Sequence, residues 1–262
     1  MLILLFFLFL CCTFSFENKN ISTIVISKNN IHSNIHQKKI IKDNSLKTLI
    51  LNSTNFILLK GVIDKKTTNS FMYQLNLLPK KKNIYLYIDS PGGSVEDGNK
   101  ILNEVQKYKI KCITERAYSM AFAIFQGCSK RYIIPYAKLM QHQMSFGIKD
   151  EKAKIESYIE FINQIEDELI LLQSSKIGMS TKEFKDKTYN EWWIFGESNI
   201  KQNCADKIIQ IKCSKQLTSY NYTISEKYYD YVYSKCPLVG HYIEKIKKET
   251  KESNSIFDIL FE

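Results

Sequence analysis

The stretch IYLYIDSPGGSV (84–95) decides the fold that the rest of the sequence can adopt. Its first six residues are aliphatic and aromatic apart from a final Asp, and they predict a buried strand at 84–89. The strand runs directly into Ser-Pro-Gly-Gly, where Gly92 and Gly93 can expose their backbone N–H groups because no Cβ stands in the way. An amphipathic helix is predicted at 95–108. A strand that passes through a glycine turn into a helix is typical of an α/β domain.

The same alternation of strands and helices continues outward from this stretch. Hydrophobic spacing and Gly or Pro boundaries separate the segments, and no internal repeat is visible. We therefore predict an α/β domain with a mostly parallel sheet. The further predicted elements are a helix at 71–78, a strand at 109–114, a helix opened by Ser119 and ended by Gly127, two short strands within 131–142 broken at Pro135, a long helix at 150–177, and a helix pair around 191–198.

The composition is typical of a globular chain and has an excess of positive charge. The 262 residues are 44% hydrophobic and 24% charged, and 37 Lys and Arg exceed 27 Asp and Glu by ten. Only Arg116 and Arg131 are arginines, whereas readers of nucleic acid lean on arginine for bidentate contacts. The lysines are scattered through Lys/Asn/Ile-rich sequence. We interpret the charge as a compositional bias and expect no nucleic-acid partner.

The N-terminus resembles a targeting leader in two parts. Residues 2–16 form an apolar run that predicts a signal peptide at 1–16, with an uncleaved membrane anchor as the alternative. Residues 17–50 are polar, rich in Lys and poor in acids. Such leaders resemble those that route proteins through the secretory pathway to the plastid (apicoplast) of apicomplexan parasites. We therefore expect a plastid protein, and secretion or an extracellular location is the rival.

Seven cysteines occur, and their spacing contains no CxxC pair. No zinc-binding pattern is present, and we expect neither a metal nor a cofactor. The five cysteines after the leader are an odd number and are interpreted as small hydrophobic residues rather than as a disulfide framework, with Cys213 and Cys236 as the possible exception.

Ser119 stands at the mouth of an apolar run in TERAYSMAFAIFQ (114–126). A serine between a strand and a helix has an exposed hydroxyl and free neighbouring amides, so it is either an N-cap or a nucleophile. The amides of Gly93 and Met120 can then hold an oxyanion that develops during acyl transfer. A plain tight turn and an ordinary helix cap are the alternatives at these two places.

His142 bears on this choice because it is the one histidine in the predicted core. The other three lie in the leader or in the tail. A serine needs a base such as imidazole within hydrogen-bond reach to act as a nucleophile at neutral pH. His142 ends a predicted strand 23 residues after Ser119 and is the candidate base, although a lone histidine is more often structural.

These motifs together resemble the proteolytic subunit of the Clp protease, which has the ClpP/crotonase-like fold. The resemblance covers roughly residues 54–210, with its motifs in order. They are IYLYIDSPGGSV, AYSMA, KRYIIPYAKLMQHQ, a long "handle" helix and KIGMSTKEF. It implies repeated ββα units, a Clp-like domain at 51–213, and a C-terminal extension at 214–262.

The resemblance also implies the roles of the site residues. Ser119 matches the nucleophile and His142 the general base, while Gly93 and Met120 match the positions whose amides form the oxyanion hole. Glu191 falls where the family usually has the Asp that orients the imidazole. It implies a serine endopeptidase that degrades unfolded polypeptides inside an oligomeric barrel and uses no cofactor.

The match has three departures, which keep an alternative open. The interval from Ser119 to His142 is about two residues shorter than in typical bacterial subunits and is similar to that of the phage-type relatives. Phe122 stands where a small residue is usual and could crowd the helix or fill a specificity pocket. Glu191 is one methylene longer than Asp and could orient His142 or miss it.

The resemblance finally bears on assembly and on competing functions. It implies a homo- or hetero-oligomeric ring that uses the handle helix, together with a Clp-type ATPase, although residues 17–53 lack the docking signature. The alternative is a catalytically impaired ClpR-like ring subunit with a structural role. An acyl-CoA-binding crotonase-like protein is the third hypothesis.

Overall fold

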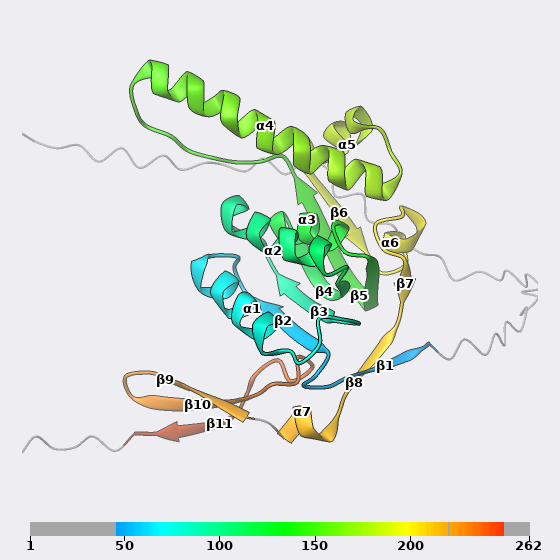
Figure 1. Cartoon of the computed structure of the whole chain (residues 1–262), viewed down its shortest axis with the longest axis vertical. Coiled ribbons are helices and arrows are strands. Elements are labelled where there is room, and N and C mark those ends of the chain that lie inside the picture. Colours follow the sequence, from blue (N-terminus) through cyan, green and yellow to red (C-terminus); the bar gives the residue numbers. More distant parts are fainter. Residues whose placement is uncertain (1–45, 220, 249–262) are drawn as a thin grey trace, which may run out of the picture. The chain divides into compact units, whose positions relative to one another are not determined.

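The computed structural model describes residues 46–219 and 221–248 (Figure 1). Its elements, in chain order, are β1 (Thr48–Leu51), β2 (Phe56–Lys60), α1 (Lys65–Leu77), β3 (Tyr85–Ser90), α2 (Val95–Lys107), β4 (Lys111–Tyr118), α3 (Met120–Gln126), β5 (Lys130–His142), α4 (Lys152–Ile177), α5 (Thr181–Thr188), β6 (Glu191–Phe195), α6 (Ser198–Lys201), β7 (Lys207–Ile208), β8 (Gln210–Cys213), α7 (Lys215–Ser219), β9 (Asn221–Ser225), β10 (Tyr229–Ser234) and β11 (Tyr242–Lys247).

A six-stranded sheet forms the centre of the described chain. Strands β2, β3, β4 and β5 lie side by side in that order and run parallel, β6 joins the outer edge antiparallel, and β7 pairs with β5. Helices α1, α2 and α3 connect the parallel strands and share one hydrophobic core with the sheet and with part of α4 (Figure 1). The predicted α/β class, the mostly parallel sheet and the long helix are confirmed.

Strand β5 differs from its prediction as two short strands broken at Pro135. It is continuous, but its pairing is interrupted: Thr114 and Arg116 of β4 pair with Ile133 and Lys138, so four residues of β5 oppose one of β4. Pro135 has no N–H to give to a neighbour, and a chain can pass such a residue as a bulge. The two halves of β5 therefore have different outer partners, β7 for the first and β6 for the second.

Of two disulfides, one corrects the interpretation of Cys112 and Cys128 as isolated hydrophobic residues, and the other confirms the exception made for Cys213 and Cys236. Cys112 at the start of β4 is bonded to Cys128 after α3, and Cys213 is bonded to Cys236. The spacing of Cys112 and Cys128 could not reveal their pairing, because only the return of β5 alongside β4 brings them together. Cys204 is a buried free thiol, and burial raises its pKa to about 12, so it is inert.

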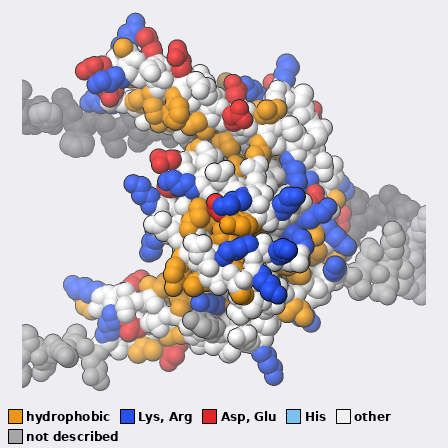
Figure 2. Space-filling model, in the orientation of Figure 1, with side chains coloured by type: hydrophobic (Ala, Val, Ile, Leu, Met, Phe, Trp, Pro, Cys, Tyr) orange, Lys and Arg blue, Asp and Glu red, His pale blue; other side chains and the backbone are white. Residues whose placement is uncertain are grey.

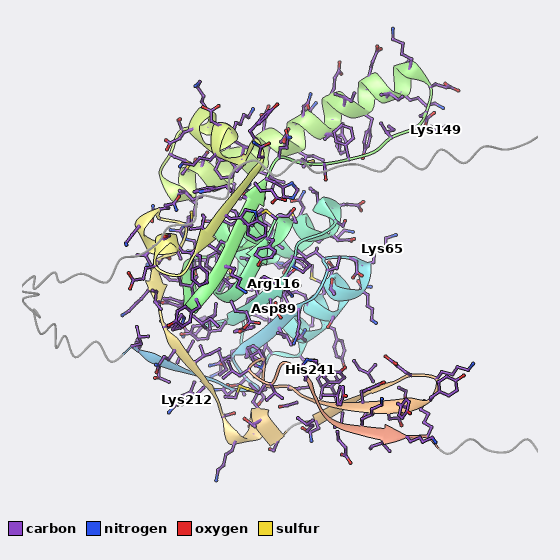
Figure 3. All side chains as sticks on the ribbon, turned by 180° about the vertical axis from the view of Figure 1, so that it is seen from behind. Lys65, Asp89, Arg116, Lys149, Lys212 and His241 are labelled. Atoms are coloured by element: carbon purple, nitrogen blue, oxygen red, sulfur yellow. A yellow bond between two sulfur atoms is a disulfide. The ribbon has the colours of Figure 1, made fainter. Side chains whose placement is uncertain are left out.

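The ends of β3 and β4 are held in register by an ion pair. Asp89 and Arg116 are opposite each other in the sheet, and Arg116 Nε donates to Asp89 Oδ1 at 2.8 Å (Figure 3). Asp89 is buried and directly precedes the Ser-Pro-Gly-Gly turn. Arg116 lies three residues before Ser119. The pair therefore fixes the two loops that carry the predicted site.

The structure describes only part of the predicted segments that flank the Clp-like domain. The predicted signal peptide at 1–16 and most of the predicted leader at 17–50 lie outside the described residues, although β1 already begins at Thr48 and pairs with β8. In the C-terminal extension, β9, β10 and β11 form an antiparallel sheet of their own. The described helices include none with the length and apolarity needed to span a membrane.

Arg131 forms the most extensive buried polar network in the central domain. It is 2% exposed, and its guanidinium contacts Asp206 Oδ1 at 2.7 Å, Gln126 Oε1 at 2.6 Å and the Asn203 carbonyl at 2.8 Å. The planar fork of arginine suits such multiple contacts, which a lysine could not reproduce. Burial opposes ionisation of Asp206, but the hydrogen bonds and charge of Arg131 outweigh it and hold the pKa of Asp206 below its ordinary value.

We expect Asp206→Asn to lower the free energy of unfolding by about 3 kcal/mol, because it leaves the buried Arg131 without its counter-charge. Urea denaturation at neutral pH measures this. The Asp206 carboxylate stabilises the fold while it is ionised, so the difference in free energy of unfolding between variant and wild type narrows as the pH falls below the ordinary pKa of an aspartate and through the lowered pKa of Asp206. The control, Asp186→Asn, removes the exposed Lys182 pair and should cost under about 1 kcal/mol. A difference that persists unchanged at pH 2 would contradict this account.

Candidate active site

Ser119 occupies the turn between β4 and α3 in a strained backbone conformation. Its φ is 53° and its ψ is −124°, a region that residues with a Cβ rarely adopt. The serine stands at the N-cap position, but its side chain makes no capping hydrogen bond. Its N–H donates to the Met140 carbonyl at 2.9 Å, which ties the turn to β5. An ordinary helix cap would use the hydroxyl that is left free here.

The Ser-Pro-Gly-Gly turn packs directly against this strained turn. Gly92 has a φ of 91°, and a Cβ at this position would lie 2.5 Å from the Tyr118 carbonyl oxygen and 2.8 Å from the Ser119 Cβ. Gly93 has a φ of 145°, and its added Cβ would meet the Ile63 carbonyl at 2.3 Å. Both glycines are therefore required by backbone conformation and by close approach, beyond what a plain tight turn would need.

The amides of Gly93 and Met120 are unused donors. The neighbouring groups are bonded, because the Gly92 carbonyl accepts from Ile63 N–H and the Ser94 N–H donates to the Ile63 carbonyl, both at 2.8 Å. Neither the Gly93 nor the Met120 N–H has an acceptor within the described part of the chain. Both residues line the same cavity as Ser119. Two free amides beside a serine hydroxyl can stabilise a developing oxyanion.

His142 is brought to this cavity by β5. The strand lies parallel to β4, with Tyr118 opposite Met140, so the end of β5 lies beside the turn that follows β4. The resulting cavity has a volume of about 280 Å³ and is lined by Gly93, Ser119, Met120 and His142, among others. Four of the five predicted site residues therefore meet in one cavity.

Glu191 lies next to the site but outside the cavity lining. It is directly opposite His142 in the antiparallel pairing of β5 and β6, so the two side chains leave the same face of the sheet. Its Oε2 accepts a hydrogen bond from Trp193 Nε1 at 2.8 Å. Within the described residues no hydrogen bond joins Glu191 to His142. The role predicted for Glu191 stays a prediction.

Phe122 packs inward, away from the cavity. Its side chain is fully buried and lies against Trp192, with ring centroids 6.2 Å apart, and Trp192 in turn packs on Phe184. Phe122 is not part of the cavity lining, so it does not fill a specificity pocket. The larger side chain belongs to an aromatic cluster in the core that joins α3, β6 and α5.

Sequence reasoning missed how α4 contributes to the cavity wall. Glu166, Leu169, Ile170 and Gln173 line it from one face of the helix. Of these four, only Leu169 belongs to the apolar spacing from which the long helix was predicted, and such spacing indicates only that one face is covered. The return of α4 over the end of β5 shows what that face covers.

Comparison with known proteins agrees with this architecture. The family model described as Clp protease matches residues 40–212. The "ATP-dependent Clp protease proteolytic subunit 2" of Borreliella burgdorferi is 29% identical over 181 residues, which cover 66% of this chain and 90% of that protein. The protein of the same name from Pseudomonas aeruginosa is 27% identical over 160 residues, which cover 58% and 80%. The chain therefore belongs to the Clp protease family.

Proposed function

We propose that the chain is a serine endopeptidase subunit that cuts unfolded polypeptides within an oligomeric ring. The observation that carries this proposal is the strained Ser119, with an uncapped hydroxyl, in one cavity with His142 and two unused amides. Family membership supports a proteolytic subunit of this kind. The assembly is proposed as a homo- or hetero-oligomer, with a Clp-type ATPase as a possible partner.

In the proposed reaction Ser119 Oγ attacks the substrate carbonyl carbon while His142 takes the hydroxyl proton. The carbonyl oxygen becomes an oxyanion that accepts from the Gly93 and Met120 N–H groups. His142 then gives the proton to the leaving amine as the C–N bond breaks, which leaves an acyl-enzyme on Ser119. A water attacks the ester, with its proton passed through His142, and releases the second product.

The surface proposed for contacts within the ring lies on the N-terminal half of α4. Tyr158, Ile159 and Phe161 are 40%, 38% and 54% exposed. Figure 2 shows hydrophobic side chains gathered along one edge of this helix, between acids and lysines. Exposed aromatic and aliphatic side chains that cluster in this way mark interaction surfaces. Ile162, on the same part of the helix, is buried.

We expect a fluorophosphonate probe to label the purified full chain at Ser119. Labelling should vanish in Ser119→Ala and fall about a hundredfold or more in His142→Ala, because the serine loses its base. Size-exclusion fractions should be labelled separately, so that activity confined to a ring is detected.

The control for the histidine is His241→Ala, which alters a residue of the C-terminal extension and should leave labelling unchanged. An absence of labelling in every oligomeric fraction would refute the peptidase. It would leave the alternative, a catalytically impaired ClpR-like subunit, which is favoured by the bond that Glu191 makes to Trp193 instead of to His142.

For Glu191 we predict an orienting role that needs a rotation of its side chain away from Trp193. Glu191→Gln should lower the rate of labelling more than Asn190→Ala, since loss of the orienting carboxylate can cost up to about ten-thousandfold in turnover. Rates of probe labelling under identical conditions measure this. The reverse order of the two variants would contradict the assignment.

We also propose that the protein passes through the secretory pathway to a plastid, with an extracellular location as the alternative. Residues 1–50 carry this proposal, and two disulfides support passage through an oxidising compartment. A fluorescent reporter fused to the C-terminal end of residues 1–50 should reach the plastid when the fusion is expressed in an apicomplexan parasite. Delivery of that reporter to the cell surface would overturn the plastid destination.

A further inference from the structure

The cavity beside Ser119 has one wall formed by a single face of α4. Along this face lie Glu166, Leu169, Ile170 and Gln173, one helical turn after another. Ala123 and Phe184 contribute apolar surface to the same cavity. The wall thus has a charged end at Glu166, an apolar middle, and an amide end at Gln173.

The amide end of this wall is already occupied by hydrogen bonds within the protein. Gln173 Oε1 accepts from Gln141 Nε2, and Gln173 Nε2 donates to the Leu169 carbonyl at 2.8 Å. Gln173 and Gln141 are 3% and 7% exposed, so they brace α4 against β5. Recognition of a ligand at this end would break bonds that are already made.

The charged end is different because no cation of the described residues forms a direct ion pair with Glu166. One carboxylate oxygen accepts from the Met144 N–H at 3.2 Å. Lys185 also lines the cavity, but its Nζ forms an ion pair with Asp167 Oδ1 at 2.9 Å. Among residues 46–219 and 221–248 no ion pair includes Glu166. A carboxylate with no direct ion pair thus faces the concave site that holds the candidate nucleophile, while the Lys185 ammonium within its electrostatic range is bound to Asp167.

We propose that Glu166 selects polypeptides with a lysine or arginine next to the bond that is cut. The proposal rests on the proposed peptidase function. A long basic side chain matches the wall in order, since its methylenes can lie on Leu169 and Ile170 while its cationic head reaches the carboxylate. Hydrogen bonds between two charged groups are about twice as strong as neutral ones, so we expect about a tenfold to hundredfold preference.

The test compares two diphenyl phosphonate probes that differ only in the side chain entering the cavity, arginine or the uncharged norleucine. The full chain should react with the arginine probe at least about tenfold faster. Glu166→Gln should remove this preference, and Glu166→Lys should reverse it in favour of a glutamate probe. Glu168→Gln is the matched control, because Glu168 lies on the same helix, exposed and outside this cavity.

The fluorophosphonate probe, which lacks an amino-acid side chain, separates failure of this proposal from failure of the peptidase function. If it labels Ser119 but the norleucine probe reacts equally fast or faster, and Glu166→Gln changes nothing, the preference for basic residues is overturned while the peptidase stands.

A binding measurement keeps the preference testable even if no probe reacts. Fluorescence polarisation of the Ser119→Ala chain with fluorescein-labelled arginine and norleucine peptides should show at least about tenfold tighter binding of the arginine peptide. Glu166→Gln in the same background should abolish that difference. Equal binding of the two peptides by the Ser119→Ala chain would overturn the proposal.

Discussion

The approach of the Gly92 backbone to the turn at Tyr118–Met120 is the constraint on which the site depends. The space for a Cβ at Gly92 is taken by the Tyr118 carbonyl and by Ser119 itself, so the two loops meet with no side chain between them. Parallel pairing of β3 and β4 brings their ends together, and the Asp89–Arg116 pair fixes the register just before both loops. Because the two loops are in contact, the unused amides of Gly93 and Met120 line the same cavity.

Local pattern predicted the elements that carry the site because each has a short-range signal. The strand before Ser-Pro-Gly-Gly, the helix opened by Ser119 and the histidine at the end of β5 are all marked by neighbouring residues. Proximity of Ser119 and His142 could be expected only through family resemblance, because they are 23 positions apart and meet only through the pairing of β4 with β5. The continuous course of β5 past Pro135 was missed, since the bulge depends on which strands flank it.

Interactions between distant segments explain the other differences. Cys112 and Cys128 are separated by 16 residues and meet only when β4, α3 and β5 close into a unit. A disulfide around a loop of that size stabilises a fold by about 3 kcal/mol in the chain-entropy account. Phe122, unusual by comparison with the family pattern, is matched by Trp192 from β6, a compensation that no local window contains. Arg131 gains Asn203 and Asp206 as partners from the segment that follows α6.

The unequal support of Ser119 and His142 has a consequence for the dynamics of the molecule. Ser119 follows a central strand, in a loop closed by a disulfide and packed on a fully buried helix. His142 ends β5, and at that end its outer neighbour is β6, a five-residue edge strand whose alternate residues face solvent. Edge elements open locally at lower free energy than the centre of a fold. Backbone amides around His142 should therefore exchange with solvent well before those around Ser119, and moderate heating will displace His142 from the cavity while the core around Ser119 remains folded.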